Sequence, residues 1–158
     1  RGLLDYEKLG LKVTHWEYME DAPPQAGPRA HQYYGDDDVT SWNASFDLHG
    51  GGGIVTDTRE LTLFMRGLLK GMLFKHESTL VAMTTRGTLP YRLGLMVMDC
   101  NGRVAFGHRG FWNTFAFHVP SQDLTVGGSI LSHDAANSRE LMCRLVDAVV
   151  AAVEGQGK

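Results

Sequence analysis

The sequence lacks several features that would define a class of protein. Its net charge is only −3, so it has no basic excess of the kind that nucleic-acid-binding proteins and polybasic membrane-binding segments carry. Its longest apolar run, Ala148–Val153, is far shorter than the roughly 20 residues that span a bilayer. Hydrophobic residues make up 43% and charged residues 21%, which excludes wholesale disorder, collagen and coiled coil. We therefore expect a globular chain with no nucleic-acid partner and no membrane span.

Cysteines and metal-binding motifs are also scarce. The two cysteines, Cys100 and Cys143, cannot make a disulfide framework, and we expect them to be small buried apolar residues and not a bridge. The histidines are scattered, with no His-Glu-x-x-His, and no Cys-x-x-Cys is present, so we expect no metal site. The absence of Gly-x-Ser-x-Gly argues against the nucleophile of an α/β-hydrolase.

Proline and glycine mark two irregular stretches in the first half. Residues Asp21–Asp38 hold several prolines and an acidic run, which predicts a surface loop that is either a solvated linker or a binding or lid loop. The run Gly50–Gly53 is not a phosphate-binding loop, because no lysine follows it. We expect it to allow a close backbone approach that leads into the next helix.

Two helices are predicted after the glycine run. Asp57 is a good N-cap, and Glu60 completes an acidic variant of the capping box. Apolar residues then recur at helical spacing on one face: Leu61, Phe64, Met65, Leu68 and Leu69. Gly71 is the predicted stop, and a shorter helix is predicted from His76 to about Thr84.

The period changes to that of strands after Gly94. Asn101-Gly102 between apolar runs predicts a β-hairpin, and further strands are predicted at 114–119 and 124–131, antiparallel because their connections are short. Asn137 or Asp134 would cap a last helix, whose predicted apolar face comprises Met142, Leu145, Val146, Val149 and Val153. The predicted fold class is α+β, an antiparallel sheet with packed helices.

The segment Gly107–Asn113, at the end of a predicted strand, is the most informative for function. Strand alternation places His108 and Gly110 on one face and Arg109 on the other. A histidine beside an uncovered backbone N–H could meet an oxyanion. A surface histidine next to a hairpin glycine explains the same residues.

Four segments resemble, in order, the serine β-lactamase and D-alanyl-D-alanine carboxypeptidase superfamily, in its class C and esterase-like branch. They are Leu9-Gly10-Leu11 with Thr14 and Trp16, Gly51–Val55 leading into Thr58–Leu61, His108-Arg109-Gly110, and the closing strand and helix. The resemblance runs from about Leu3 to the end. It implies the C-terminal half of that fold, a partial β-lactamase/transpeptidase-like structure.

The resemblance also implies catalytic roles for His108, Gly110 and Phe111. In that superfamily a Lys-Thr-Gly or His-x-Gly strand motif lines the active site. His108 would supply a polar group near the nucleophile, and the Phe111 N–H, just after Gly110, would be one half of the oxyanion hole. No cofactor is implied.

Substrate-binding roles are expected for Arg109 and Asn113, with Arg109 placed where the family often binds a substrate carboxylate. The side chains of Phe111 and Trp112 are expected to pack in the core, so only the Phe111 backbone is given a role. The substrate would be a small molecule or a peptide.

Two motifs of the superfamily are missing. Ser-x-x-Lys supplies the nucleophile and a base, yet no serine of this chain is followed by lysine three residues later. No tyrosine begins Tyr-x-Asn or Tyr-x-Ser. Both motifs belong to the half that would precede Arg1. We therefore expect the chain to be inactive alone and to have the missing N-terminal half as a companion chain, or else a solubility problem.

Two hypotheses of function follow. In the first, residues 1–158 are the C-terminal part of one domain of a β-lactamase-like serine hydrolase (esterase, D-peptidase or β-lactamase type) that forms an acyl-serine intermediate on a nucleophile outside this chain. Residues 1–90 would be helical and loop segments, and residues 91–158 the sheet and last helix. In the second, the chain is a non-catalytic peptide- or glycan-binding module on the same scaffold. The resemblance favours a bacterial periplasmic or secreted location and leaves a cytoplasmic one open.

Overall fold

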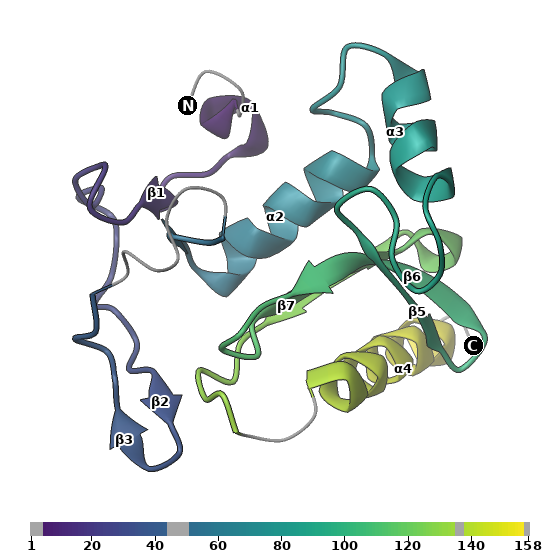
Figure 1. The fold of residues 1–158 in the computed structure, drawn as a ribbon. Coiled ribbons are helices and arrows are strands. Elements are labelled where there is room, and N and C mark those ends of the chain that lie inside the picture. Colours follow the sequence, from purple (N-terminus) through teal and green to yellow (C-terminus); the bar gives the residue numbers. More distant parts are fainter. Residues whose placement is uncertain (1–4, 44–50, 135–137, 157–158) are drawn as a thin grey trace.

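The computed structural model describes residues 5–43, 51–134 and 138–156. Its helices are α1 (Tyr6–Leu9), α2 (Thr58–Leu69), α3 (Glu77–Thr85), α4 (Ser138–Gln156) and a short 3₁₀ helix, η2 (Pro120–Gln122). Its strands are β1 (His15–Trp16), β2 (Tyr33–Tyr34), β3 (Asp37–Asp38), β4 (Ile54–Val55), β5 (Met96–Cys100), β6 (Arg103–Arg109), β7 (Phe115–Val119) and β8 (Leu124–Gly128). Figure 1 shows these elements.

The main sheet is an antiparallel meander in the order β5-β6-β7-β8. The predicted hairpin is confirmed: Asn101 and Gly102 join β5 to β6 with φ of 55° and 82°, the positive values that a tight two-residue turn requires. β8 ends at Gly128, short of the predicted Leu131, which has a φ of 60° and turns the chain out of the extended conformation. The α+β class is confirmed.

β7 is the centre of the core, because helices cover both faces of the sheet. Every β7 residue is buried. On one face Phe115, Phe117 and Val119 pack with α4, and on the other Ala116 packs with Met65 and Leu69 of α2 and with Leu95. Figure 1 shows α4 and α2 on opposite sides of these strands. β6 pairs with this buried strand as far as Arg109, and the pairing fixes the position of the last residues of β6.

The predicted apolar face of α4 is partly wrong. Met142 and Val146 are buried as predicted, and Val150 joins them. The other predicted positions stay between 38% and 66% exposed: Leu145, Val149 and Val153. A helix meets a sheet along one row of residues four apart, and the row through Met142 makes this contact. The neighbouring row is left uncovered in the part of the chain that the structure describes.

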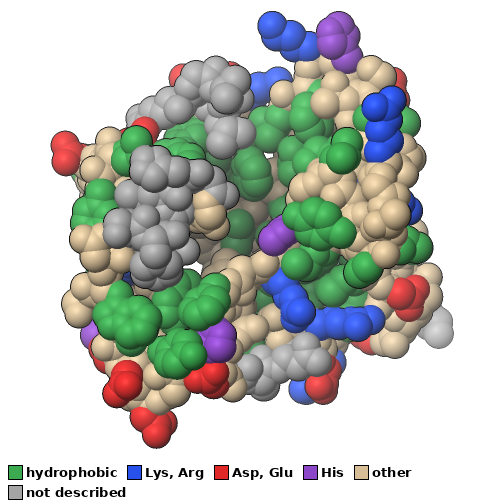
Figure 2. All heavy atoms as spheres, in the orientation of Figure 1, with side chains coloured by type: hydrophobic (Ala, Val, Ile, Leu, Met, Phe, Trp, Pro, Cys, Tyr) green, Lys and Arg blue, Asp and Glu red, His purple; other side chains and the backbone are tan. Residues whose placement is uncertain are grey.

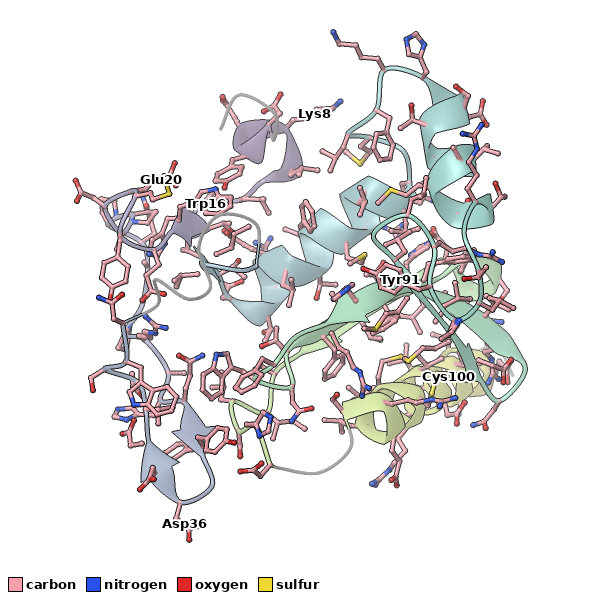
Figure 3. All side chains as sticks on the ribbon, in the orientation of Figure 1. Lys8, Trp16, Glu20, Asp36, Tyr91 and Cys100 are labelled. Atoms are coloured by element: carbon pink, nitrogen blue, oxygen red, sulfur yellow. A yellow bond between two sulfur atoms is a disulfide. The ribbon has the colours of Figure 1, made fainter. Side chains whose placement is uncertain are left out.

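The expectation that the two cysteines are unbridged is wrong. Cys100 is buried, as expected, but it forms a disulfide with Cys143 of α4. The packing of α4 on the sheet brings the two Cα atoms to 5.1 Å, a normal distance for a disulfide. Figure 3 shows the bridge beside Cys100. It ties α4 to the β5–β6 hairpin across a separation of 43 residues.

α2 begins as predicted, but Glu60 does not complete a capping box. Asp57 accepts a hydrogen bond from Glu60 N at 2.7 Å, which confirms the N-cap. The Glu60 carboxylate turns instead to the segment before β1. There it accepts hydrogen bonds from the backbone N–H groups of Lys12, Val13 and Thr14 and from the Thr14 hydroxyl. The side chain fastens the N-terminal segment to α2.

The two irregular stretches contain short strands that composition did not predict. β4 follows the glycine run and pairs with β1, and Glu17 N donates to Gly53 O at 2.8 Å, so the expected backbone approach at Gly53 is real. Gly50 lies outside the described residues. Within the predicted loop, β2 and β3 form a hairpin. None of the helices the structure describes is long and apolar enough to cross a membrane.

Candidate active site

The end of β6 places His108 and Arg109 on opposite faces of the sheet, as strand alternation predicts. His108 pairs with Ala116, which faces α2, whereas Arg109 pairs with Phe115, which faces α4. Both side chains are exposed. Arg109 is therefore not brought to the His108 side, and its role in binding substrate stays a prediction.

A tight turn from Gly110 to Asn113 follows β6. Gly110 N donates to Thr114 O at 2.7 Å, and Asn113 N donates to Gly110 O at 3.1 Å. Among the hydrogen bonds of the described residues, none engages the Phe111 N–H. The turn thus leaves one backbone donor, three residues after His108, that no described residue engages, and hydrogen bonds of the neighbouring residues hold the turn.

Gly107 and Gly110 differ in the space around them. A Cβ at Gly110 would meet no atom closer than Thr114 O at 4.0 Å, so the space beside Gly110 is open to a ligand. A Cβ at Gly107 would lie 2.0 Å from Ala116 O, which no packing tolerates. Gly107 is therefore required for β6 to pair with β7, a need that the sequence pattern alone does not reveal.

His108 has a partner that sequence reasoning missed. The Tyr91 hydroxyl lies 3.1 Å from His108 Nε2, and the two rings meet edge to face with centroids 5.8 Å apart. Tyr91 precedes β5 and is held there because Val97 N donates to Pro90 O and Arg92 N to Leu95 O. Figure 3 labels Tyr91 in the loop beside β5 and β6. Its contact with His108 depends on strand register, so no local motif signals it.

The Asn113 side chain is hydrogen-bonded to the chain after β8. The φ of Asn113 is 54°, and its side-chain Nδ2 donates to Ser132 O at 2.7 Å and to His133 O at 3.1 Å. These bonds tie the turn after β6 to the chain after β8. A direct contact between Asn113 and substrate stays a prediction.

The expectation that the Phe111 side chain packs in the core is wrong. Its ring is 54% exposed and lies with its centroid 4.2 Å from that of His133. Tyr34 of β2 stacks on the same histidine at 4.8 Å, and Trp42 lies 6.2 Å from Tyr34. We call Tyr34, Trp42, Phe111 and His133 the aromatic cluster. Figure 2 shows hydrophobic side chains with a histidine gathered over the β2–β3 hairpin and the nearby end of the main sheet.

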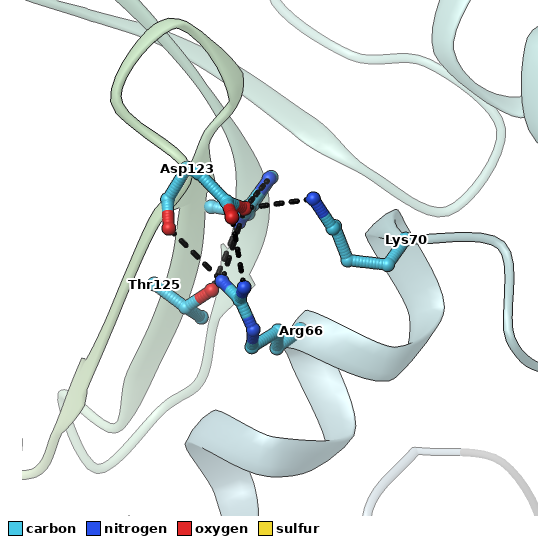
Figure 4. Close-up of polar contacts among 5 residues, drawn as sticks. Arg66, Lys70, Asp123 and Thr125 are labelled. Atoms are coloured by element: carbon cyan, nitrogen blue, oxygen red, sulfur yellow. Dashed lines mark hydrogen bonds and ion pairs between the residues drawn. The ribbon is translucent and has the colours of Figure 1, made fainter.

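A second polar cluster joins α2 to the turn between β7 and β8 (Figure 4). Asp123 pairs with Arg66 and with Lys70, each at 2.9 Å, and the hydrogen bonds from Arg66 and then Lys70 lower its pKa to about 2. Beside it, His118 is buried against Thr125, and this burial lowers the His118 pKa. This turn lies at the opposite end of β7 from Gly110. The cluster therefore fastens α2 to the sheet and is separate from His108.

Metal-ligating side chains do not converge in the described part of the chain, where no three His, Cys, Asp or Glu residues are placed to hold an ion together. The side chain that contacts His108 is the phenol of Tyr91, and the Phe111 N–H follows in the next turn. Such donors suit hydrogen bonding to a polarised carbonyl oxygen.

Comparison with known proteins identifies the family of the chain. The family model described as "Beta-lactamase" matches residues 6–151. A search of curated proteins by sequence found no match. The chain belongs to the beta-lactamase family, because the matched residues cover most of its length.

Solved structures of D-amino acid amidase from Ochrobactrum anthropi SV3 share the fold. The complex with L-phenylalanine amide has a TM-score of 0.71 and 17% identity, covering 94% of this chain and 49% of that chain. The complex with D-phenylalanine has a TM-score of 0.70 and 17% identity, covering 94% and 50%. The chain therefore spans about half the length of these structures. They confirm the α+β, β-lactamase-like fold.

Proposed function

We propose that this chain forms the oxyanion side of the active site of a serine hydrolase that cleaves ester or amide bonds, with the nucleophilic serine outside residues 1–158. The observation that carries the proposal is the Phe111 N–H, which no described residue engages, in the hydrogen-bonded turn that follows His108 at the end of β6. Family membership supports it.

The reaction would proceed through an acyl-serine. The serine hydroxyl attacks the carbonyl carbon, and the negative charge on the carbonyl oxygen is stabilised by two backbone N–H groups, of which Phe111 supplies one. The leaving group departs with a proton, and water then attacks the acyl-serine to release the acid and restore the hydroxyl. Removing one such donor typically slows an enzyme by about 10²-fold or more.

His108 would hydrogen-bond to reacting groups near the nucleophile, in an orientation set by Tyr91. An imidazole held at a fixed angle needs no reorientation when charge develops, which is the advantage of a preorganised site. The 3.1 Å contact with the Tyr91 hydroxyl and the edge-to-face ring packing supply that orientation.

The substrate carries an acyl carbonyl next to a leaving oxygen or nitrogen. Esters, amides, D-amino acid peptides and β-lactams share this chemistry. The similar solved structures are of a D-amino acid amidase with phenylalanine amide or phenylalanine, which supports an amino acid amide as the first substrate to examine.

A complementary half would cover the exposed apolar row of α4. Leu141, Leu145, Val149 and Val153 lie four residues apart and stay between 38% and 66% exposed. An uncovered apolar row of this kind is typical of an interface. Because the chain spans about half of the similar structures, we propose that the half carrying the nucleophile packs on this row.

A non-catalytic peptide- or glycan-binding module is the second candidate. One observation favours it: neither Ser-x-x-Lys nor Tyr-x-Asn occurs in the 158 residues. A binding module would keep the aromatic cluster and have no use for the Phe111 N–H.

The test is replacement of His108 in the protein that contains both this chain and the nucleophile. We expect His108→Ala to lower kcat by about 10²-fold, with the free energy of unfolding nearly unchanged because the side chain is exposed. Unchanged kcat/KM with several esters and D-alanyl peptides would remove His108 from the mechanism.

A further inference from the structure

We propose that the aromatic cluster is a substrate subsite that binds a flat, uncharged aromatic group next to the reacting carbonyl. This inference rests on the proposed function for its position and goes beyond it in naming the part of the substrate that the chain selects. The four side chains come from the β2–β3 hairpin, the chain just after it, the turn after β6 and the chain after β8.

The rings form a continuous surface that is open to solvent. Tyr34 stacks on His133 at 4.8 Å between centroids, and Phe111 lies against the same histidine at 4.2 Å with its plane tilted by 35°. The planes of Tyr34 and Phe111 differ by only 15°. Exposed fractions are 44% for Tyr34, 50% for Trp42 and 54% for Phe111. Three large rings left this open in one place form a ready platform for a further ring, because aromatic pairs gain energy in stacked or edge-to-face contact.

Hydrogen bonds hold this surface in one shape. Tyr33 N donates to Leu131 O at 2.8 Å, and His133 N donates to Tyr33 O at 3.0 Å, so the hairpin is bonded to the chain after β8. Gly35 N donates to Asp134 Oδ2 at 2.7 Å. On the other side, Asn113 Nδ2 binds the Ser132 and His133 carbonyls. A surface assembled in advance loses little conformational entropy when a ligand binds.

Position links the cluster to the reaction. Phe111 contributes its N–H to the proposed oxyanion hole and its ring to the aromatic cluster, so the two sites share this residue. A group bonded to the reacting carbonyl, on the acyl or the leaving side, would therefore reach the rings within a few bonds. A surface that binds another macromolecule would not need to lie next to the proposed oxyanion hole.

Negatively charged side chains near the aromatic cluster should determine which aromatic groups of a substrate it accepts. Asp134 Oδ1 lies 2.6 Å from His133 Nδ1, and the hydrogen bond from His133 followed by that from Gly35 lowers the Asp134 pKa. Asp36 and Asp37, in the same hairpin as Tyr34, are exposed. Carboxylates at the rim repel an anion, so a phenyl group should be accepted and a carboxyphenyl group rejected.

The test compares esters that differ only in one group, in the protein that contains both this chain and the nucleophile. The reference is ethyl acetate. The probes are ethyl phenylacetate, with the ring on the acyl side, and benzyl acetate, with the ring on the leaving side; the cyclohexyl and carboxyphenyl analogues serve as matched controls. We expect kcat/KM to favour at least one phenyl probe over its cyclohexyl analogue.

Variants assign that preference to the cluster. Tyr34→Leu and Trp42→Leu keep an apolar side chain and leave Phe111 untouched, and each should lower kcat/KM for the preferred phenyl probe by about fivefold while ethyl acetate turnover is unchanged. Tyr18→Leu, at a tyrosine that is 64% exposed outside the cluster, should change neither. Tyr34→Phe, which keeps the ring, should retain the preference.

Binding separates failure of this inference from failure of the proposed function. Phenylacetamide should shift the NMR signals of Tyr34, Trp42 and Phe111, and acetamide should not. Shifts without turnover of any ester would contradict the hydrolase and leave the subsite standing. Turnover of ethyl acetate with equal rates for phenyl and cyclohexyl probes, and no shifts, would overturn the subsite alone.

Discussion

The hydroxyl of Tyr91 lies 3.1 Å from Nε2 of His108, and the two residues come from chain segments that meet only because β5 pairs with β6. The contact leaves Nδ1 as the remaining ring nitrogen of His108. Through this contact we propose that Tyr91 positions His108.

Replacement of Tyr91 tests this relationship. Tyr91→Phe removes the hydroxyl and keeps the edge-to-face packing, so we expect kcat to fall by about fivefold, the value of one hydrogen bond of about 1 kcal/mol. In the double variant with His108→Ala the loss of Tyr91 should have no further effect, because its partner is gone. Steady-state kinetics on one amide measures both, with Tyr18→Phe as the control. Additive losses would show that Tyr91 acts independently of His108.

Glu60 should make the protein sensitive to acid. Burial opposes ionisation of its carboxylate, but hydrogen bonds from Lys12, Thr14 and Val13 outweigh burial and lower the Glu60 pKa from 4.5. The unfolded chain therefore takes up this proton first as pH falls. Stability from Glu60 is complete above pH 4.5 and is lost as pH falls through the lower folded value.

Glu60→Gln should cost about 2 kcal/mol of unfolding free energy at neutral pH, since a charged acceptor of backbone N–H groups is lost. Urea unfolding across the acid range measures the loss, with the exposed Glu7→Gln as control. The variant should also lose part of the pH dependence below 4.5. Parallel pH profiles for the variant and the native protein would contradict this role.

The disulfide between Cys100 and Cys143 should contribute substantially to stability. A bridge that closes 43 residues restricts the unfolded chain, which corresponds to about 4 kcal/mol in the chain-entropy estimate. Reductant, or Cys143→Ser, should therefore lower Tm clearly in calorimetry. Such bridges persist in oxidising compartments and are rare where thiols are kept reduced. Two free thiols in the natively isolated protein would refute the bridge.

The pKa of Asp123 should depend on Arg66 more than on Lys70. Arg66 is the stronger hydrogen-bond donor to the carboxylate, whose pKa is about 2. Arg66→Gln should raise the Asp123 pKa toward 3.8, and Lys70→Gln should raise it less. Carbon-detected NMR titration of the carboxyl group measures each value. Equal shifts in the two variants would contradict the bidentate geometry.

Local signals predicted much of the fold. Asp57 marked the start of α2, and Asn101-Gly102 marked the β5–β6 turn, because caps and tight turns depend on a few neighbouring residues. Contacts between distant segments were not predictable in this way. The Cys100–Cys143 bridge depends on how α4 packs, and the buried row of α4 depends on its rotation about its axis.

The candidate site also contains residues that the sequence predicted and residues that it did not. His108 and the turn that presents the Phe111 N–H follow from the strand pattern and the resemblance. Tyr91 and the rings of Tyr34 and Trp42 carry no motif, and they reach the site through strand register and through the hairpin bonded to the chain after β8.

Labelling with a fluorophosphonate probe, followed by mapping of the modified peptide, tests the central claim most directly. The 158-residue chain alone should take no label above a heat-treated control, because none of its serines has the lysine that would activate it. When the half that carries the nucleophile is added, label should appear on a serine of that half, and His108→Ala should slow the labelling. A stoichiometric adduct on a serine within residues 1–158 would contradict the account.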